Sequence, residues 1–197
     1  MFNLINIQKG EWPRFLLAFS YFFFLLAGYF MLRPIRGTVA ANHSGYLHLL
    51  YTGTFITMLL IVPVFGALVA KFRRGQFIPG IYLFFISNLV FFAFAFAFKG
   101  DATPDWVQWS FYIWLSVFNL FVVSIFWSFM ADIFHPDQAQ RLFGSIMAGG
   151  SLGAIAGPLL TANWVGQIGS GKVMVIAIAF LLVATALAIA LGRYERY

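Results

Sequence analysis

The sequence predicts an all-α integral membrane protein with six transmembrane helices. Hydrophobic residues make up 62% of the 197 residues and charged residues only 9%, whereas soluble domains carry about a quarter charged residues. The mean hydropathy is +0.89. The apolar residues also come in runs of about 20, the helix length that crosses a hydrocarbon core roughly 30 Å thick. Such a chain has too little polar surface to dissolve, so we expect a lipid bilayer around it.

Six apolar runs follow one another along the chain, separated by short connections that carry charge, proline or glycine. Strands of a membrane barrel alternate apolar and polar residues, and runs such as 22–26 and 173–191 do not. Helices are therefore expected. We predict a single six-helix domain over residues 1–197, with spans at about 14–33, 45–70, 76–98, 106–131, 140–166 and 172–192.

Each boundary between spans has a helix-ending signal. In chain order the signals are Pro34 with its flanking arginines, the basic residues of 71–74, Pro104, Pro136 and the glycine-rich segment 166–171. The first span is too long for the apolar core of a secretory signal and no small-residue cleavage site follows it, so we expect it to be retained.

Basic residues are distributed unequally between the two predicted sides of the membrane. One side, which includes both termini, holds eight of them, namely Lys9, Arg14, Lys71, Arg73, Arg74, Arg141, Arg193 and Arg196. The other side holds Arg33, Arg36, Lys99 and Lys172. Since cytoplasmic loops are enriched in Lys and Arg, we expect a multi-pass protein of the plasma (inner) membrane with both termini in the cytoplasm.

Several function classes are disfavoured by composition. The net charge of +6 is spread over helix ends and forms no basic face, so no nucleic-acid partner is expected. The chain has no cysteine, no phosphate-binding glycine loop, no H-E-x-x-H motif and no paired carboxylates within a span. We therefore expect no enzyme, no catalytic residue, no metal site and no cofactor.

The connection between the second and third spans, residues 66–75, resembles a loop of major facilitator superfamily transporters. The matching residues are Gly66, Leu68, Lys71 and Arg74, whereas Ala70 and Arg73 depart from the family pattern. The resemblance implies that Gly66 lets two helices approach and that Lys71, Arg73 and Arg74 act in gating. Simple positive-inside charge is the alternative explanation.

Two further stretches resemble the bacterial branch of that superfamily related to NTP/NDP exchange transporters. They are residues 29–36, and residues 126–134 with 138–144 beyond them. The resemblance covers only the N-terminal half of such transporters, so it implies a 3+3 inverted-repeat fold that works with a second six-helix half. That half would be a second copy, a separate subunit or a missing C-terminal remainder.

The fifth span carries Gly149, Gly153 and Gly157 at four-residue spacing, followed by Pro158. Glycines at this spacing form one smooth stripe on which another helix can pack backbone to backbone. The stretch resembles helix five of superfamily antiporters, and tight helix packing alone is the alternative explanation. Pro158 releases one hydrogen bond and permits a bend.

Polar residues within the spans are candidates for solute binding, because polar groups in a membrane are costly. Asn119, Asn88 and Tyr21 lie at depth, where interhelical hydrogen bonding is the alternative. Arg33 and Arg36 are the first candidates for an anion, since guanidinium groups match carboxylate and phosphate, with interfacial snorkelling as the alternative.

Asp132 and Arg141 flank the corner between the fourth and fifth spans and are candidates for a salt bridge that changes during gating. Together these features predict a secondary-transporter module that moves a small organic, anionic solute by alternating access. The alternative is a non-transporting membrane scaffold or accessory subunit that binds other membrane proteins or pigments through its phenylalanine-rich surface.

Overall fold

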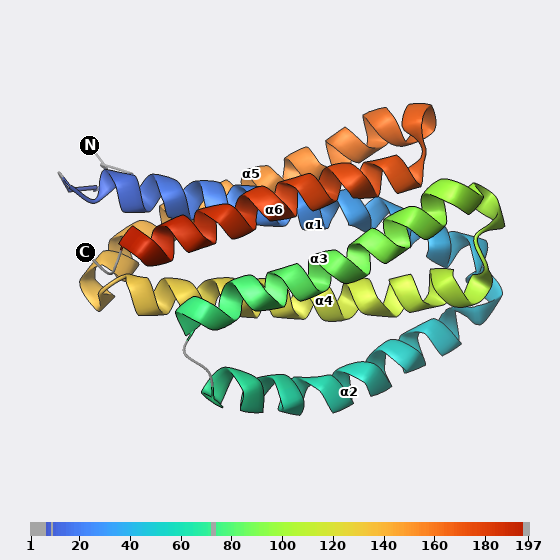
Figure 1. Cartoon of the computed structure of the whole chain (residues 1–197), viewed down its shortest axis with the longest axis horizontal. Helices are drawn as coiled ribbons and strands as arrows, with labels where there is room; N and C mark the ends of the chain where they lie inside the picture. The colour runs from blue at the N-terminus through green and yellow to red at the C-terminus, as the bar shows by residue number, and fades with distance from the viewer. Residues whose placement is uncertain (1–6, 9, 72–73, 195–197) are drawn as a thin grey trace.

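The structure is a computed structural model that describes residues 7–8, 10–71 and 74–194, except for the side chains of 68–71, 74–77 and 101. These residues form six long helices and no strand (Figure 1). The helices are α1 (Trp12–Asn42), α2 (Leu47–Lys71), α3 (Arg74–Lys99), α4 (Asp105–Ile133), α5 (Pro136–Ile168) and α6 (Ser170–Tyr194), with short 3-10 turns η1 (Ser44–Tyr46) and η2 (Gly100–Ala102). All six are long and apolar enough to cross a membrane. The predicted all-α membrane fold is confirmed.

The first helix is longer than the predicted span. The sequence pattern ends it near Pro34, whereas α1 continues through Pro34 to Asn42. Proline fixes a helical φ and removes only one backbone donor, and such a loss is tolerated in membrane helices. The Thr38 hydroxyl donates to the Pro34 carbonyl oxygen over 3.3 Å. As a result Arg33 and Arg36 lie within a helix instead of in a loop.

The six helices run up and down, and α1 lies at the centre of the bundle, against α4, α5 and α6 (Figure 1). The principal contacts are α1 with α5, α2 with α4, α1 with α6, α3 with α4, α3 with α6 and α1 with α4. If α1, α2 and α3 are exchanged with α4, α5 and α6, respectively, each contact in this set becomes another contact of the same set or itself. An inverted repeat of three helices produces this pattern. Two contacts depart from this symmetry, α5 with α6 and α4 with α5, because their counterparts, α2 with α3 and α1 with α2, are weaker among the described residues.

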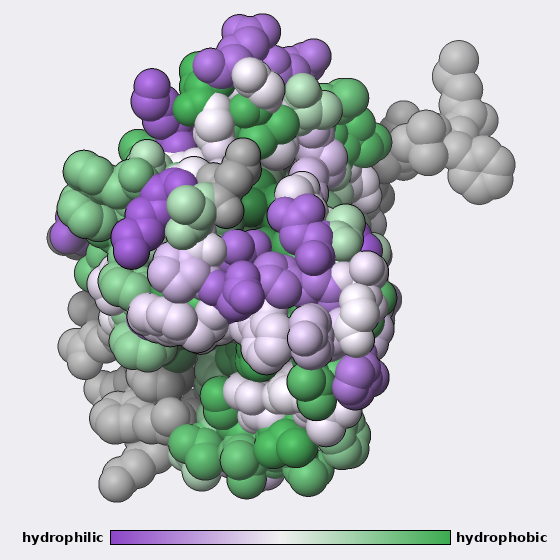
Figure 2. Space-filling model, turned by 90° about the vertical axis from the view of Figure 1, so that its right-hand side faces the viewer, coloured by the Kyte–Doolittle hydropathy of each residue, from purple (hydrophilic) through white to green (hydrophobic). Residues whose placement is uncertain are grey.

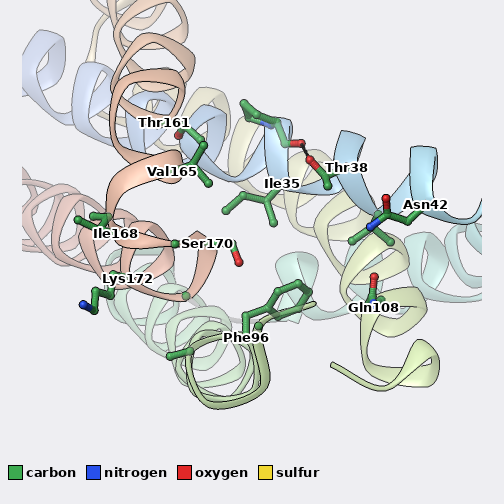
Figure 3. A pocket seen from close by; sticks show the side chains of 16 residues that line it. Ile35, Thr38, Asn42, Phe96, Gln108, Thr161, Val165, Ile168, Ser170 and Lys172 are labelled. Carbon is green, nitrogen blue, oxygen red and sulfur yellow. Dashed lines mark hydrogen bonds between the residues drawn. The ribbon is translucent and has the colours of Figure 1, made fainter. Parts of the chain in front are cut away.

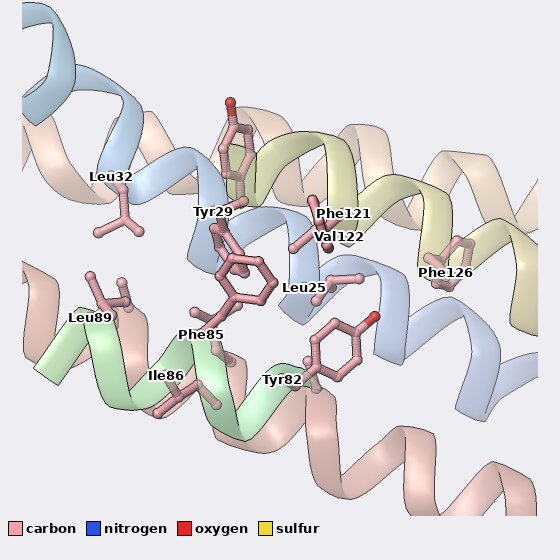
Figure 4. Packing of buried hydrophobic residues seen from close by; sticks show 14 of the residues in the cluster. Leu25, Tyr29, Leu32, Tyr82, Phe85, Ile86, Leu89, Phe121, Val122 and Phe126 are labelled. Atoms are coloured by element: carbon pink, nitrogen blue, oxygen red, sulfur yellow. The ribbon is translucent and has the colours of Figure 1, made fainter. Parts of the chain in front are cut away.

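The core between α1, α3 and α4 is filled by aliphatic and aromatic side chains (Figure 4). Phe22 of α1 stacks on Phe126 of α4, with ring centroids 3.9 Å apart. Phe85 of α3 lies 5.0 Å from Phe118 of α4. Since lipid is as apolar as these side chains, close packing and not water exclusion holds them together.

The seam between α1 and α5 is a backbone-to-backbone contact. A Cβ atom built on Gly149 would lie 2.7 Å from the Phe19 carbonyl oxygen, and one on Gly157 would lie 2.6 Å from that of Ala27. Gly153 meets the Phe23 carbonyl oxygen in the same way. The predicted glycine stripe is therefore a packing surface for α1.

The stripe continues one turn further, where the Thr161 hydroxyl donates to the Met31 carbonyl oxygen over 2.8 Å. Thr161 is only 1% exposed. Pro158, between Gly157 and Thr161, lies within an unbroken α5. The two helices are thus joined by close contact and by a buried hydrogen bond.

Candidate functional site

Arg36, toward the C-terminal end of α1, is held by an aromatic side chain of α4. Its guanidinium carbon lies 3.8 Å from the centre of the Tyr112 ring on α4. Its Nε donates to the carbonyl oxygen of the same tyrosine over 3.2 Å. A cation over an aromatic face is attracted by the ring quadrupole, so Tyr112 fixes the direction of the guanidinium.

Other polar side chains extend this site along α1 and α4. Arg33, one helical turn before Arg36, is exposed, and its guanidinium carbon lies 5.4 Å from the Phe30 ring centre. Ser116 and Asn119 follow Tyr112 by one and two turns of α4, which places them on the same face. Asn119 is exposed. We call Arg33, Arg36, Tyr112, Ser116 and Asn119 the arginine–asparagine face.

Two of the candidate polar residues do not join this face. Tyr21 is completely buried, and its hydroxyl is hydrogen-bonded to that of Tyr82 on α3. This is the interhelical bond that was the alternative explanation for Tyr21. The amide nitrogen of Asn88 donates to the Phe84 carbonyl oxygen of its own helix over 2.7 Å. Asn88 instead borders an apolar groove of about 550 Å³ between α2, α3 and α4.

An ion pair ties α1 to α5 at the end of the bundle that contains both termini. Arg141 binds Glu11 with both arms of its guanidinium, Nη2 to Oε1 at 2.8 Å and Nη1 to Oε2 at 3.3 Å. Gln138 also donates to Oε1, over 3.1 Å. Hydrogen bonds from Arg141 and from the Gln8 backbone lower the pKa of the Glu11 carboxyl. Asp132, the partner expected for Arg141, is exposed.

Sequence reasoning missed Glu11, although it places Glu11 and Arg141 on the same side of the membrane. The two residues are 130 positions apart. The signal that the sequence offers is that Glu11 and Arg141 carry opposite charges on the same predicted side of the membrane. It does not select this pair, because Arg14 and Arg193 lie on that side as well.

A second polar contact joins α1 to α4 at the opposite end of the bundle. His43 is 8% exposed, its Nδ1 lies 2.9 Å from the Val39 carbonyl oxygen and its Nε2 lies 3.1 Å from Asp105 Oδ1. Trp109 contacts the imidazole edge to face, with ring centroids 5.8 Å apart. Both ring nitrogens therefore face oxygen atoms.

The predicted gating loop is only partly described. Arg73 lies outside the described residues, and the side chains of Lys71 and Arg74 are not described either. Gly66 is exposed, and a Cβ atom there would meet no atom within 4 Å. The expectation that Gly66 brings two helices close together stays a prediction, because the side chains of residues 68–71 and 74–77, which follow it, are not described.

The opposite end of the bundle also contains a cavity of about 460 Å³ between α1, α3, α4, α5 and α6. It lies on the side of α1 that carries Thr38 and Asn42, away from the Arg36 contact with Tyr112. Figure 2 shows this end of the molecule, with hydrophilic residues gathered across its middle. No group of three or more His, Asp or Glu side chains able to hold a metal occurs in the part of the chain that the structure describes.

No family model matches the chain, and no curated protein or solved structure matches it either. The fold and the polar face define a multi-pass, all-α membrane protein.

Proposed function

We propose that the chain is a six-helix module of a secondary transporter for a small organic anion, working with a second six-helix half. The observation that carries this proposal is the pair of guanidinium groups on the arginine–asparagine face. Two permanent cations in a helix that is long and apolar enough to span a membrane are costly unless they meet protein, water or an anion. Arg36 is already oriented by Tyr112, and Arg33 is exposed beside it.

The arrangement of helices supports the same proposal. The helix contacts are those of two three-helix repeats of opposite direction, and in transporters with such repeats the substrate lies at the interface between halves. The resemblance of the sequence to major facilitator transporters adds to this, as does the cationic connection between α2 and α3. In this proposal both termini are cytoplasmic, in the plasma (inner) membrane.

The ends of α1 supply the groups for alternating access. Glu11 with Arg141 joins α1 to α5 at one end, and His43 with Asp105 joins α1 to α4 at the other. Opening one end of a cavity requires the contact at that end to loosen while the other holds. Each pair has a member in contact with solvent, since the side chains of Arg141 and Asp105 are 24% and 76% exposed. Ion pairs that solvent can reach contribute modest net stability, which suits contacts that form and break in each cycle.

The test is counterflow in proteoliposomes with two labelled probes, ADP and malate. Arg33→Gln removes an exposed cation, so folding is preserved, and we expect flux to fall by roughly tenfold or more because a charge-assisted hydrogen bond to the solute is lost. Arg193→Gln removes an exposed arginine at the end of α6 and is the matched control. The absence of Arg33-dependent flux with both probes contradicts the proposal.

The exposed apolar surface of α2 favours a second candidate function, a membrane scaffold. Phe55, Leu59 and Leu60 on α2 are 66%, 63% and 66% exposed. A scaffold would use this surface to hold another membrane protein or pigment, and Arg33→Gln would then leave the host complex unchanged. Mass measurement after mild detergent extraction separates the two, since transport requires a particle with twelve helices.

A further inference from the structure

The cavity at the end opposite the termini has the size and lining of a ligand site. Its volume of about 460 Å³ lies within the range of small-molecule pockets, about 300–1,000 Å³. Five helices contribute to it, and Figure 3 shows their side chains around one open space. Its polar lining comes mainly from Thr38, Asn42, Gln108, Thr161 and Ser170.

Gln108 presents an unused hydrogen-bond acceptor to this cavity. The residue is only 8% exposed, and its Nε2 donates to the Thr103 carbonyl oxygen over 2.8 Å. That bond requires a donor and so fixes which end of the amide is the oxygen. Oε1 accepts no hydrogen bond from the part of the chain that the structure describes, and it is not one of the fully buried unpaired atoms there, so a molecule in the cavity can reach it. A ligand with a hydroxyl or amino group would satisfy it.

The first turn of α6 presents donors to the same cavity. Gly169, with φ +82°, ends α5, and α6 begins at the next residue. Gly171 lies directly against the backbone of Ala97 on α3, where a Cβ atom would overlap, so the first turn of α6 is held at the cavity wall. The first backbone N–H groups of a helix have no helical partner and carry the positive end of its dipole.

The cavity lining carries little side-chain charge. Among the residues that the structure describes it includes no aspartate or glutamate, and its one lysine, Lys172, is exposed and points away from the open space (Figure 3). The Ser170 hydroxyl lies beside the α6 amides and adds one more donor (Figure 3). An anion at a helix N-terminus is stabilised by those amides and by the helix dipole together.

We propose that this cavity binds a small organic oxyanion that carries a hydroxyl group, with the oxyanion at the first turn of α6 and the hydroxyl donating to Gln108 Oε1. A glycerol phosphate has this chemistry. It is available both as a soluble ester and as the headgroup of an anionic lipid. The proposal does not depend on transport, since the site lies on another side of α1 from the arginine–asparagine face.

The soluble source is tested by calorimetric titration of the whole chain in phosphatidylcholine nanodiscs. We expect saturable binding of glycerol 3-phosphate, weaker binding of inorganic phosphate and none of glycerol. Gln108→Leu should weaken glycerol 3-phosphate about tenfold, the effect of one lost hydrogen bond, and leave phosphate unchanged. Gln167→Leu replaces an exposed glutamine at the end of α5 and is the matched control.

Two more variants keep the test independent of folding. Ser170→Ala preserves the Gln108 bond to Thr103 and should weaken both phosphate and its ester severalfold. Asn42→Asp places a negative charge at an exposed position of the cavity lining and should weaken both ligands as well, more so at low salt. Unchanged affinity in Gln108→Leu and Asn42→Asp overturns the proposal.

The lipid source is tested by native mass spectrometry of protein released from nanodiscs that contain phosphatidylglycerol. Retention of this lipid by the wild type and its loss in Gln108→Leu identify the headgroup as the ligand. Displacement of the lipid by glycerol 3-phosphate identifies one site for both sources. If neither the soluble ester nor the lipid binds in a Gln108-dependent manner, the proposal is wrong.

Discussion

Two seams of the bundle, α1 with α5 and α2 with α4, are counterparts under exchange of the two halves, yet they are built differently. Glycines of α5 place the backbones of α1 and α5 in contact. In the other seam, a Cβ atom on Gly53 would lie 3.0 Å from Cδ1 of Ile113, the far end of a flexible side chain. Phe65 and Phe121 fill the same seam, with ring centroids 4.1 Å apart.

The helices α1 and α2, one from each seam, also differ in how much of their surface is buried. Within the most apolar stretch of each helix, 61% of the residues of α1 are buried inside the structure, compared with 6% for α2. Both stretches are similarly apolar, with hydropathies of 2.1 and 1.9. The position of a helix in this bundle is therefore set by small residues that permit close approach and not by hydrophobicity, because lipid competes equally for apolar surface.

The largest effect should come from adding volume to the α1–α5 seam. In Gly153→Val the new side chain overlaps the Phe23 carbonyl oxygen, which belongs to the backbone and cannot turn aside. We expect a loss of about 3 kcal/mol or more in the free energy of unfolding. Thermal unfolding in detergent measures it. Gly144→Val, on the same helix with no atom within 4 Å of its Cβ position, is the control. Equal loss in both variants would remove the basis of the comparison.

Glycine-to-alanine substitutions, which add one methyl group, allow a direct comparison of the two seams. Gly157→Ala meets the Ala27 carbonyl oxygen at 2.6 Å, whereas Gly53→Ala meets only the end of Ile113. We expect the first change to cost about 1–2 kcal/mol. The second should be neutral or stabilising, since alanine favours a helix over glycine by about 1 kcal/mol. Chemical unfolding of the pair is the measurement, and the reverse order would contradict a rigid α1–α5 seam.

The hydrogen bond of the α1–α5 seam should have a smaller effect. Thr161→Val leaves the shape nearly unchanged and removes the donor to the Met31 carbonyl oxygen, for an expected cost of about 1 kcal/mol. Thr52→Val on α2 is matched to it, because the Thr52 hydroxyl bonds only to the His48 carbonyl oxygen of its own helix and is exposed. No change is expected there. The shift in unfolding midpoint of each variant gives the result.

The smallest effect concerns the pH dependence of the α1–α5 seam at its terminal end. Arg141 and the Gln8 amide lower the pKa of Glu11 below 4.5 in the folded protein. The carboxylate therefore stabilises the fold fully above its unfolded pKa, and this stabilisation is lost as the pH falls through the lower folded value. The unfolding midpoint should fall less steeply with acid in Glu11→Gln than in the wild type below pH 4.5. Parallel curves would contradict this role of Glu11.

Composition and spacing predict the fold class and the glycine stripe, because both depend on local sequence. The continuation of α1 past Pro34 could not be predicted this way, since tertiary contacts decide whether a membrane helix accommodates a proline. The glycines of α5 show the same limit. Gly149 packs against the backbone of α1, whereas a Cβ atom on Gly144 would meet no described atom within 4 Å, because the arrangement of helices decides whether a neighbour is present.

The candidate site likewise contains some residues that the sequence indicates and others that only the fold brings to the site. Arg33 and Arg36 stand out in the sequence as charges next to a long apolar run, but Tyr112, which orients Arg36, lies 76 positions away. Gln108 gives no signal in the sequence, because its role depends on a cavity formed by five helices. Contacts between distant segments are the part that sequence patterns leave open.

The most direct test of the central claim is the solvent accessibility of the arginine–asparagine face. The chain has no cysteine, so single cysteines can be placed without further changes. Asn119→Cys on this face and Phe94→Cys on an exposed apolar surface of α3 can be treated in sealed membranes with a charged, membrane-impermeant thiol reagent. If the face lines an aqueous path for an anion, Asn119→Cys reacts and Phe94→Cys does not. Equal protection of both positions would place Asn119 in lipid and contradict a transport role for this face.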